Sequence, residues 1–218
     1  MKKKILIVSL ACIPIALAVL VFEKVSNPLT FTAEDRVHID PNMAQRISVY
    51  GDIHAVSNSD GSLYFDEEIQ ETQVWLCKKV TEPIVIAESI PGCDSVTFTY
   101  IVNQLRRDSP NMSQKEVLER LSIVGDNYVS YLPRFVLHSD KLIFGGENDS
   151  LYCAIGKQGD AKNTPENVNA RSRAMLLNAI KIAEKYPTQR IAIIIGRKHL
   201  PWFAWNGIKT IDPNKVNR

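Results

Sequence analysis

Short apolar segments of strand length recur along the chain and alternate with longer segments of helical character. Four of them are rich in Val, Ile and Leu, and they cover residues 46–54, 83–90, 141–147 and 190–196. Continuous apolar runs of this length are typical of strands that are buried on both faces of a sheet. The pattern therefore predicts four buried strands, and residues 208–211 suit a fifth.

The helical segments lie between these strands. The strongest helical periodicity covers residues 167–186, and further helices are expected at residues 95–107, 113–124 and 201–207. Ser113, with Glu116 three positions later, matches a capping box. Residues 67–80 suit either a strand or a helix, and the polar residues 55–65 suit a loop. Buried strands separated by helices predict an α/β fold with a central, mostly parallel or mixed sheet flanked by helices.

The N-terminus has a different pattern, an 18-residue apolar run over residues 5–22 that follows three lysines. As a helix with a rise of 1.5 Å per residue, this run is about 27 Å long, close to the hydrocarbon thickness of a bilayer. It suits a transmembrane signal anchor, a cleaved secretory signal peptide or a buried core helix. We expect a signal anchor at residues 1–24, a linker at residues 25–44 and the α/β domain at residues 45–218.

The same lysines explain the positive charge of the chain. With 26 Lys and Arg against 24 Asp and Glu, the net charge is +2. Lys2, Lys3 and Lys4 supply three of these 26, so residues 5–218 hold 23 basic against 24 acidic residues, a net charge of −1. Because no basic stripe remains, no nucleic-acid partner is expected. The lysines instead favour a membrane-anchored domain on the extracytoplasmic side, periplasmic or extracellular, or a secreted one if the leader is cleaved.

The cysteines do not form a recognisable framework. Cys77, Cys93 and Cys153 fall in the expected domain, and no pair of them has CxxC spacing. This spacing excludes a zinc ribbon, and three thiols allow at most one disulfide. We interpret them as small, partly buried apolar side chains.

Polar or ionisable residues stand at or near the carboxyl ends of four predicted strands. These residues are His54, Glu88, Glu147 and His199. In parallel α/β sheets, ligands bind beyond the carboxyl ends of the strands. We therefore expect a functional site at this edge. Structural roles are the alternatives: a salt bridge to a buried arginine for Glu88, and a loop or cap for Glu147.

The two histidines share a GxxH motif. Gly51 precedes His54 by three positions, as Gly196 precedes His199. A glycine after a strand permits a sharp turn or a close backbone approach, so both imidazoles face one crevice if the two strands are neighbours. Two neutral imidazoles and the carboxylate of Glu88 suit a divalent metal ion with an open position for water. Without a metal, the same groups provide a base and its orienting partner for hydrolysis.

Arg171 is singled out by the helical geometry of residues 167–186. At about 100° per residue it lies beside a predicted buried stripe, whereas Arg173 lies on the opposite face. The stripe consists of Val168, Met175, Ala179, Ile182 and Tyr186. From this position Arg171 could reach a carboxylate, an oxyanion or a substrate acid. Alternatively, it could extend beside the core to solvent.

These motifs, in this order, resemble the TraB/Tiki/GumN family and its relatives, the erythromycin-esterase and ChaN groups. The resemblance covers about residues 46–213 and rests on the first GxxH motif, VIAESIPG around Glu88, RSRAM from Arg171, and GRKHLPWF from Gly196. The chain departs from the family pattern at Ser172, where Asp or Asn is usual, and at Leu176, where Ala is usual. Arg197 and Lys198 are also bulkier than the residues common in the second GxxH motif.

The resemblance implies a membrane-anchored hydrolase of Tiki type, a metal-dependent peptidase or an esterase. His54, Glu88 and His199 would then hold Mn, Co or Zn, or activate water directly, and Arg171 would stabilise developing negative charge. Glu147, Gly51 and Gly196 are expected as additional parts of the site. The substrate would be a peptide or a small molecule.

The relatives also suggest an alternative of a different class, a non-catalytic ChaN-like module that binds haem, iron or an envelope partner. In the sequence, this alternative is supported by Tyr50, Tyr152 and the aromatic residues between positions 202 and 205. Those aromatic residues, Trp202, Phe203 and Trp205, suit hydrophobic packing or the mouth of the site. A third interpretation is a degenerate family member whose motifs have only structural roles.

Overall fold

The computed structural model describes part of the chain, and the α/β fold lies within one compact unit, Ala33–Arg218. The described residues are 31–53, 56–57, 63–64, 67–88, 103–105, 107, 113, 116, 131–146 and 164–216. The expected anchor at residues 1–24 lies outside them, as do His54, Glu147, Tyr152, Cys93 and Cys153. Within the described residues, no helix combines the length and apolar character needed to cross a membrane.

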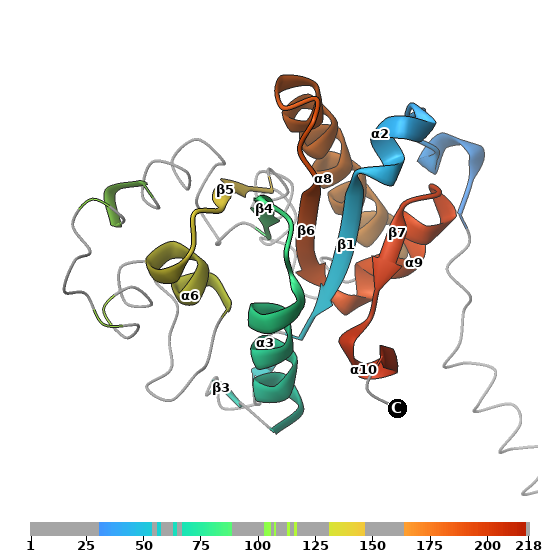
Figure 1. The fold of residues 1–218 in the computed structure, drawn as a ribbon. Coiled ribbons are helices and arrows are strands. Elements are labelled where there is room, and N and C mark those ends of the chain that lie inside the picture. Colours follow the sequence, from blue (N-terminus) through green and yellow to red (C-terminus); the bar gives the residue numbers. More distant parts are fainter. Residues whose placement is uncertain are drawn as a thin grey trace, which may run out of the picture. The chain divides into compact units, whose positions relative to one another are not determined.

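A parallel five-stranded sheet forms the centre of the fold (Figure 1). Its strands are β1 (Ile47–Asp52), β4 (Ile84–Ala87), β5 (Leu142–Gly145), β6 (Ile191–Gly196) and β7 (Lys209–Ile211), in the order β5-β4-β6-β1-β7. All of the strand pairs in this sheet are parallel. The predicted α/β class with a parallel sheet is therefore confirmed, and each of the five expected strands is present.

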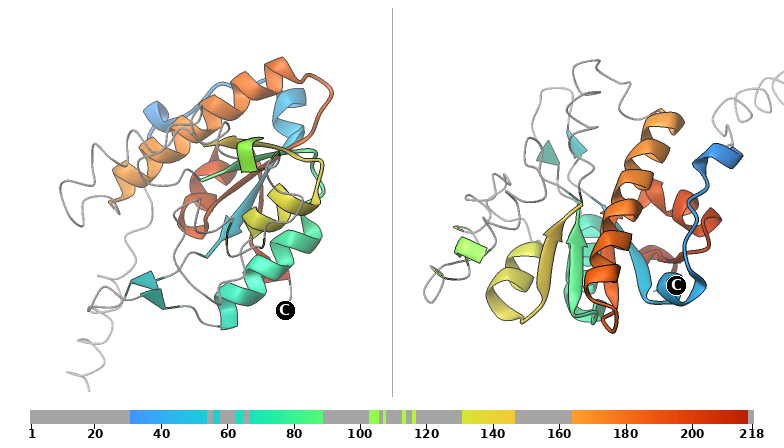
Figure 2. Two further views of the ribbon diagram at one scale, coloured as in Figure 1. Left: turned by 90° about the vertical axis from the view of Figure 1, so that its left-hand side faces the viewer. Right: turned by 90° about the horizontal axis from the view of Figure 1, so that it is seen from above.

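Helices cover both faces of the sheet. From β1 the chain moves along the sheet to β4 and β5, then returns to β6 and β7. Because parallel crossovers are right-handed, this reversal places α3 (Glu67–Lys79) and α6 (Tyr131–His138) on one face. It places α8 (Pro165–Lys185) and α9 (Leu200–Trp205) on the other. The left view of Figure 2 shows the sheet between α3 and α8.

Alternate strand residues divide the core between these two faces. The core on the α3 and α6 side includes Tyr50, Val85, Ala192 and Ile194 from the strands. The intervening residues of the strands, which are also buried, face α8 and α9 because successive side chains point to opposite faces. Strands buried on both faces explain why their sequences are apolar without interruption.

The segment predicted as a loop, residues 55–65, is not purely irregular. It contains a two-residue antiparallel pair, β2 (Val56–Ser57) with β3 (Leu63–Tyr64). The ambiguous segment that follows forms the helix α3, which buries Ile69, Thr72, Gln73 and Leu76. Two of these residues are polar, so the apolar period of the helix is weak in the sequence.

Capping interactions fix several helix ends. Ser113 and Glu116 form the expected capping box: the Ser113 N–H donates to Glu116 Oε2 at 2.7 Å, and the Glu116 N–H donates to Ser113 Oγ at 3.3 Å. Most of the two helices expected at residues 95–107 and 113–124 lies outside the described residues. Of the residues described there, 103–105, 107 and 116 are helical. At the C-terminus of α8, Arg46 donates hydrogen bonds to the carbonyls of Ala183, Tyr186 and Gln189.

Part of the expected linker packs against α9. Residues 33–44 contain the 3₁₀ turn η1 (Ala33–Asp35) and most of the helix α2 (Pro41–Gln45). The Val37 N–H donates to Asn206 Oδ1 at 2.8 Å, and the Arg36 guanidinium lies 4.5 Å from the centre of the Trp205 ring. Trp205 thus packs under this segment, whereas Trp202 and Phe203 are buried in the core. The short helix α10 (Pro213–Val216) follows β7.

Candidate functional site

The carboxyl ends of three neighbouring strands meet at one edge of the sheet. The pairing of β1 with β6 runs from Ile47 opposite Ile191 to Asp52 opposite Gly196, so both strands end together. Glu88 follows β4 directly, and its N–H donates to Ile194 of β6 at 3.0 Å. This arrangement puts the end of β6 directly beside the Glu88 strand and the end of β1 one strand further along. Of the side chains expected there, Glu88 and His199 are described, whereas His54 and Glu147 lie outside the described residues.

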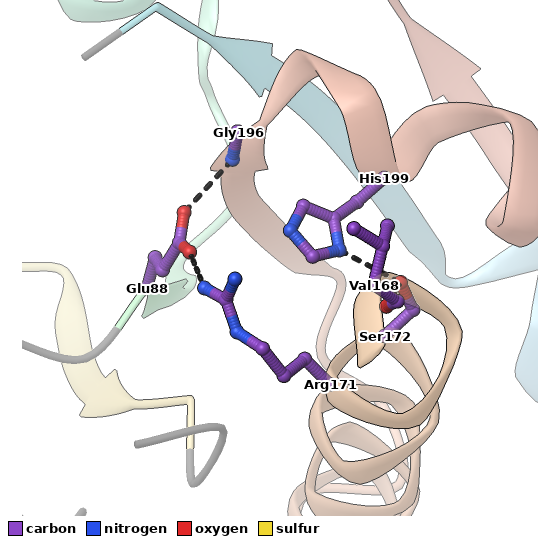
Figure 3. A network of polar contacts seen from close by, with 6 residues as sticks. All are labelled: Glu88, Val168, Arg171, Ser172, Gly196 and His199. Atoms are coloured by element: carbon purple, nitrogen blue, oxygen red, sulfur yellow. Dashed lines mark hydrogen bonds and ion pairs between the residues drawn. The ribbon is translucent and has the colours of Figure 1, made fainter. Parts of the chain in front are cut away.

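Glu88 is paired with Arg171 across the edge of the sheet (Figure 3). Its Oε1 atom lies 2.5 Å from Arg171 Nη2, and its Oε2 atom accepts the Gly196 N–H at 2.9 Å. The side chains are 13% and 5% exposed, respectively. A carboxylate at this depth requires a partner, and the guanidinium neutralises it. The contact is the structural alternative expected for Glu88, a salt bridge to a buried arginine. It also confirms that Arg171 borders the buried face of its helix and can reach a carboxylate, whereas Arg173 is exposed.

His199 is completely buried in the 3₁₀ turn η3 (Arg197–His199). Its Nδ1 atom lies 2.8 Å from Ser172 Oγ, and the Ser172 hydroxyl donates to the Val168 carbonyl at 2.7 Å. Its other ring nitrogen, Nε2, has no hydrogen-bond partner among the described residues. In Figure 3 this nitrogen is turned toward the side on which Glu88 and Arg171 lie. The imidazole is therefore held in place through Nδ1, and Nε2 can still bind a ligand or a proton.

Burial controls the protonation of His199. Loss of solvation lowers the pKa of His199 to about 4. The Glu88 carboxylate and a hydrogen bond with the Val168 backbone oppose this shift, whereas the Arg171 and Lys198 charges add to it. The imidazole is therefore neutral at physiological pH. A neutral imidazole can accept a proton or bind a metal ion through its unprotonated nitrogen.

This pKa predicts that stability falls with acid in a defined window. An unfolded histidine has a pKa of about 6.5, so the unfolded chain binds more protons than the folded one between about pH 6.5 and 4. The free energy of unfolding that depends on a neutral His199 is complete above pH 6.5. It is lost as the pH falls toward 4, by about 3 kcal/mol in total. Urea unfolding at pH 7 and pH 4.5 measures the loss. His199→Gln should lose markedly less stability than the wild type, and equal losses in both proteins would contradict the assignment.

The first GxxH glycine permits close packing of the second motif. A Cβ atom on Gly51 would lie 2.9 Å from Leu200 Cδ1, closer than real Cβ contacts allow, and 3.5 Å from the Arg197 Cα. Gly51 therefore lets the turn that carries His199 lie directly against β1. Gly146, after β5, has a related role because its Cβ would lie 2.9 Å from Met175 Cε.

We expect Gly51→Ala to destabilise the fold by roughly 1–3 kcal/mol, the usual cost of overpacking a filled site. The Leu200 side chain would have to move, and because Leu200 follows His199 directly, we expect the ring resonances of His199 to shift in NMR spectra. Gly207→Ala is the matched control. Gly207 has a positive φ of 76° but no atom within 4 Å of its Cβ position. That variant should strain the backbone and leave the His199 resonances in place.

Other residues near the edge point elsewhere. The side chains of Arg197 and Lys198 are exposed, and Arg197 forms an ion pair with Glu68 at 3.3 Å. Asp52 at the end of β1 faces α3, where its Oδ1 atom accepts a hydrogen bond from Gln73. Tyr50 lies on the same face and donates its hydroxyl to Glu82 at 2.9 Å, so burial and this carboxylate raise its pKa.

Sequence reasoning missed the role of one residue, Ser172. It stood out only as a departure from the family pattern. Its position directly after Arg171 and four residues after Val168 was the available signal, since Ser hydroxyls inside helices bond the carbonyl four residues back. That the same hydroxyl contacts His199, 27 positions away, depends on the tertiary packing of η3 on α8.

The expected metal ligands can be tested against these contacts. Within the described ranges, no group of three His, Cys, Asp or Glu side chains is placed to hold a metal ion. His199 Nε2 suits a metal, because it has no hydrogen-bond partner among the described residues and the opposite ring nitrogen contacts Ser172. Glu88 does not fit, because its two oxygens accept hydrogen bonds from Arg171 and Gly196, and the guanidinium would repel a second cation.

Comparison with known protein families finds no match, and searches of curated proteins and of solved structures return none either.

Proposed function

We propose that this protein is a membrane-anchored hydrolase related to the TraB/Tiki/GumN family, with its site at the edge formed by β4, β6 and β1. The observation that carries the proposal is the state of His199. It is buried and neutral, Ser172 holds its Nδ1 atom, and its Nε2 atom has no hydrogen-bond partner among the described residues. A buried nitrogen without a partner is costly, and such groups are typical of sites that receive a ligand or a proton.

In the proposed reaction, His199 Nε2 accepts a proton from a water molecule whose oxygen attacks a carbonyl carbon. The bond to the leaving group then breaks, and the leaving group takes the proton from His199. Arg171, held by Glu88, stabilises the negative charge that develops on the carbonyl oxygen. Because the Arg171 charge is balanced by Glu88, the resting site carries little net charge.

The contacts favour metal-independent chemistry over a metallopeptidase, since Glu88 is already engaged by Arg171. A divalent ion such as Mn, Co or Zn would act as a Lewis acid and lower the pKa of a water. It would need His199 and His54 as ligands. The haem-binding alternative receives less support, because Tyr50 faces α3 rather than the strand edge and is hydrogen-bonded to Glu82.

A hydrolysis assay on the purified full-length chain tests the proposal. The substrates are p-nitrophenyl esters of different acyl length and a panel of peptides, each measured after EDTA treatment and after addition of Mn, Co or Zn. Hydrolysis that survives EDTA is the expected result. Hydrolysis that requires an added metal would instead support the metallopeptidase version. Absence of hydrolysis under all of these conditions would refute the proposal.

The leader belongs to the same proposal and has its own test. We propose that residues 1–24 anchor the protein with the domain on the extracytoplasmic side. A protease added to intact cells, or to cells with a permeabilised outer envelope, should then degrade the domain. Protection from the protease until the inner membrane is lysed would contradict this orientation.

A further inference from the structure

We propose that Ser172 is a positioning residue that holds His199 in the tautomer with hydrogen on Nδ1, so that Nε2 presents its lone pair at the strand edge. The proposal concerns the hydrogen atoms of a buried network formed by Val168, Ser172 and His199. Its relevance to catalysis rests on the proposed function, but the tautomer itself can be measured independently of any activity.

Counting donors and acceptors leads to this tautomer. The Ser172 hydroxyl has one hydrogen and lies within hydrogen-bond distance of the Val168 carbonyl, at 2.7 Å, and of His199 Nδ1, at 2.8 Å. The carbonyl can only accept. Both contacts are therefore hydrogen bonds only if Ser172 donates to Val168 and His199 Nδ1–H donates to Ser172. If the hydroxyl donated to Nδ1 instead, the Val168 contact would have no hydrogen.

The network is rigid enough to impose this choice. Ser172 and His199 are both completely buried, and Val168 is 4% exposed. A hydroxyl that bonds the carbonyl four residues earlier is a common arrangement inside a helix, so its direction is set by α8 itself. The other side of the turn is fixed too, since the Gly196 N–H binds Glu88. The Ser172 oxygen is thus already oriented to accept a hydrogen bond from His199 Nδ1.

The charged groups around His199 do not offer Nε2 an alternative partner. Glu88 is the acceptor at the end of β4, but the contacts of its two oxygens are with Arg171 and Gly196, and no hydrogen bond joins it to Nε2. Arg171 on α8 and Lys198 on η3 are donors and could only favour an unprotonated Nε2. These groups therefore support the same tautomer.

A hydroxyl at position 172 has a different consequence from a carboxylate at the same position. A carboxylate at Nδ1 would fix the same tautomer but would also stabilise a positively charged imidazole. The Ser172 hydroxyl orients the ring without adding charge. This difference fits a site in which Arg171 and Glu88 already form a neutral pair.

Nitrogen NMR of the histidine rings tests the proposal, because protonated and unprotonated ring nitrogens have well separated shifts. The spectra are recorded on the full-length chain with ¹⁵N-labelled histidine at pH 7, and His199 is assigned by the signal lost in His199→Gln. We expect the wild type to show a protonated Nδ1 and an unprotonated Nε2. A wild-type ring protonated on Nε2 would overturn the proposal without any variant.

Two serine variants separate positioning from general packing. Ser172→Ala should shift the ring toward the Nε2–H tautomer that free histidine prefers, and Ser172→Thr, which keeps the hydroxyl, should retain Nδ1–H. Ser139→Ala is the matched control, since the Ser139 hydroxyl makes the same bond to the carbonyl four residues earlier, at 2.7 Å to Phe135. An unchanged tautomer in a folded Ser172→Ala variant would overturn the proposal.

Activity gives a separate result. If the chain is a hydrolase, Ser172→Ala should lower kcat and leave KM unchanged, because the substrate contacts remain. If no hydrolysis is found, the NMR result still stands or fails alone. A failure of the tautomer proposal can therefore be distinguished from a failure of the proposed hydrolase function.

Discussion

Arg171→Met should lower the free energy of unfolding by about 3–5 kcal/mol, because it removes the guanidinium whose positive charge balances the buried carboxylate of Glu88. Methionine preserves much of the volume of the arginine stem, so the loss reports mainly on charge. Glu88→Gln should also be strongly destabilising, since it removes the negative charge that balances the buried guanidinium. Urea unfolding monitored by circular dichroism at pH 7 provides the measurement.

The exposed ion pair between Arg197 and Glu68 is the matched control. Its side chains are 43% and 54% exposed, compared with 5% and 13% for the buried pair. Arg197→Met should therefore cost no more than about 1 kcal/mol. The double variant Arg171→Met with Glu88→Gln should cost less than the sum of the two single changes, because it removes both charges. Equal costs for Arg171→Met and Arg197→Met would contradict the burial of the pair.

The second large effect concerns catalysis. His199→Gln should reduce kcat/KM for the preferred ester by roughly 10²-fold, the lower end of the usual contribution of a positioned general base, because a base with a pKa of about 4 is weaker than one that titrates near the operating pH. Glutamine fills similar space but cannot accept the proton. The variant should remain folded, which circular dichroism and the melting temperature can verify.

His38→Gln is the control for this substitution, because His38 is exposed and lies in the segment between η1 and α2. Its hydrolysis rate should equal that of the wild type. If His199→Gln retained the full rate in a folded protein, the assignment of His199 as the base would be wrong. If both variants lost activity equally, the loss would reflect a general effect of histidine replacement.

Much of the fold follows from the sequence, because its strands are buried on both faces. The apolar runs before Glu88 and Gly196 contain no polar positions, so their short length predicts buried strands. In the structure they form β4 and β6. Residues 67–80 were ambiguous for a physical reason. The helix α3 buries Thr72 and Gln73, and Gln73 is satisfied by Asp52 and by the Tyr131 N–H, which are distant in sequence.

The candidate site was accessible from the sequence only in part. Helical geometry was enough to place Arg171 beside the core, and the strand-end rule was enough to place Glu88 and His199 at one edge. The direct contact between Arg171 and Glu88 joins residues 83 positions apart and depends on how α8 packs on the sheet. The hydroxyl of Ser172 acquires its role in the same way, from the packing of η3.

The pH dependence of kcat/KM tests whether a neutral, buried His199 is the general base, since this parameter reports the pKa values of the free enzyme. With an ester that does not ionise between pH 3.5 and 8, a neutral, buried His199 with a pKa of about 4 predicts a rate that is constant from pH 7 to about pH 5 and falls below it. Circular dichroism at each pH verifies that the protein remains folded. An inflection near pH 6.5, as for a solvated histidine, or one near pH 7 that disappears with EDTA, would contradict the account.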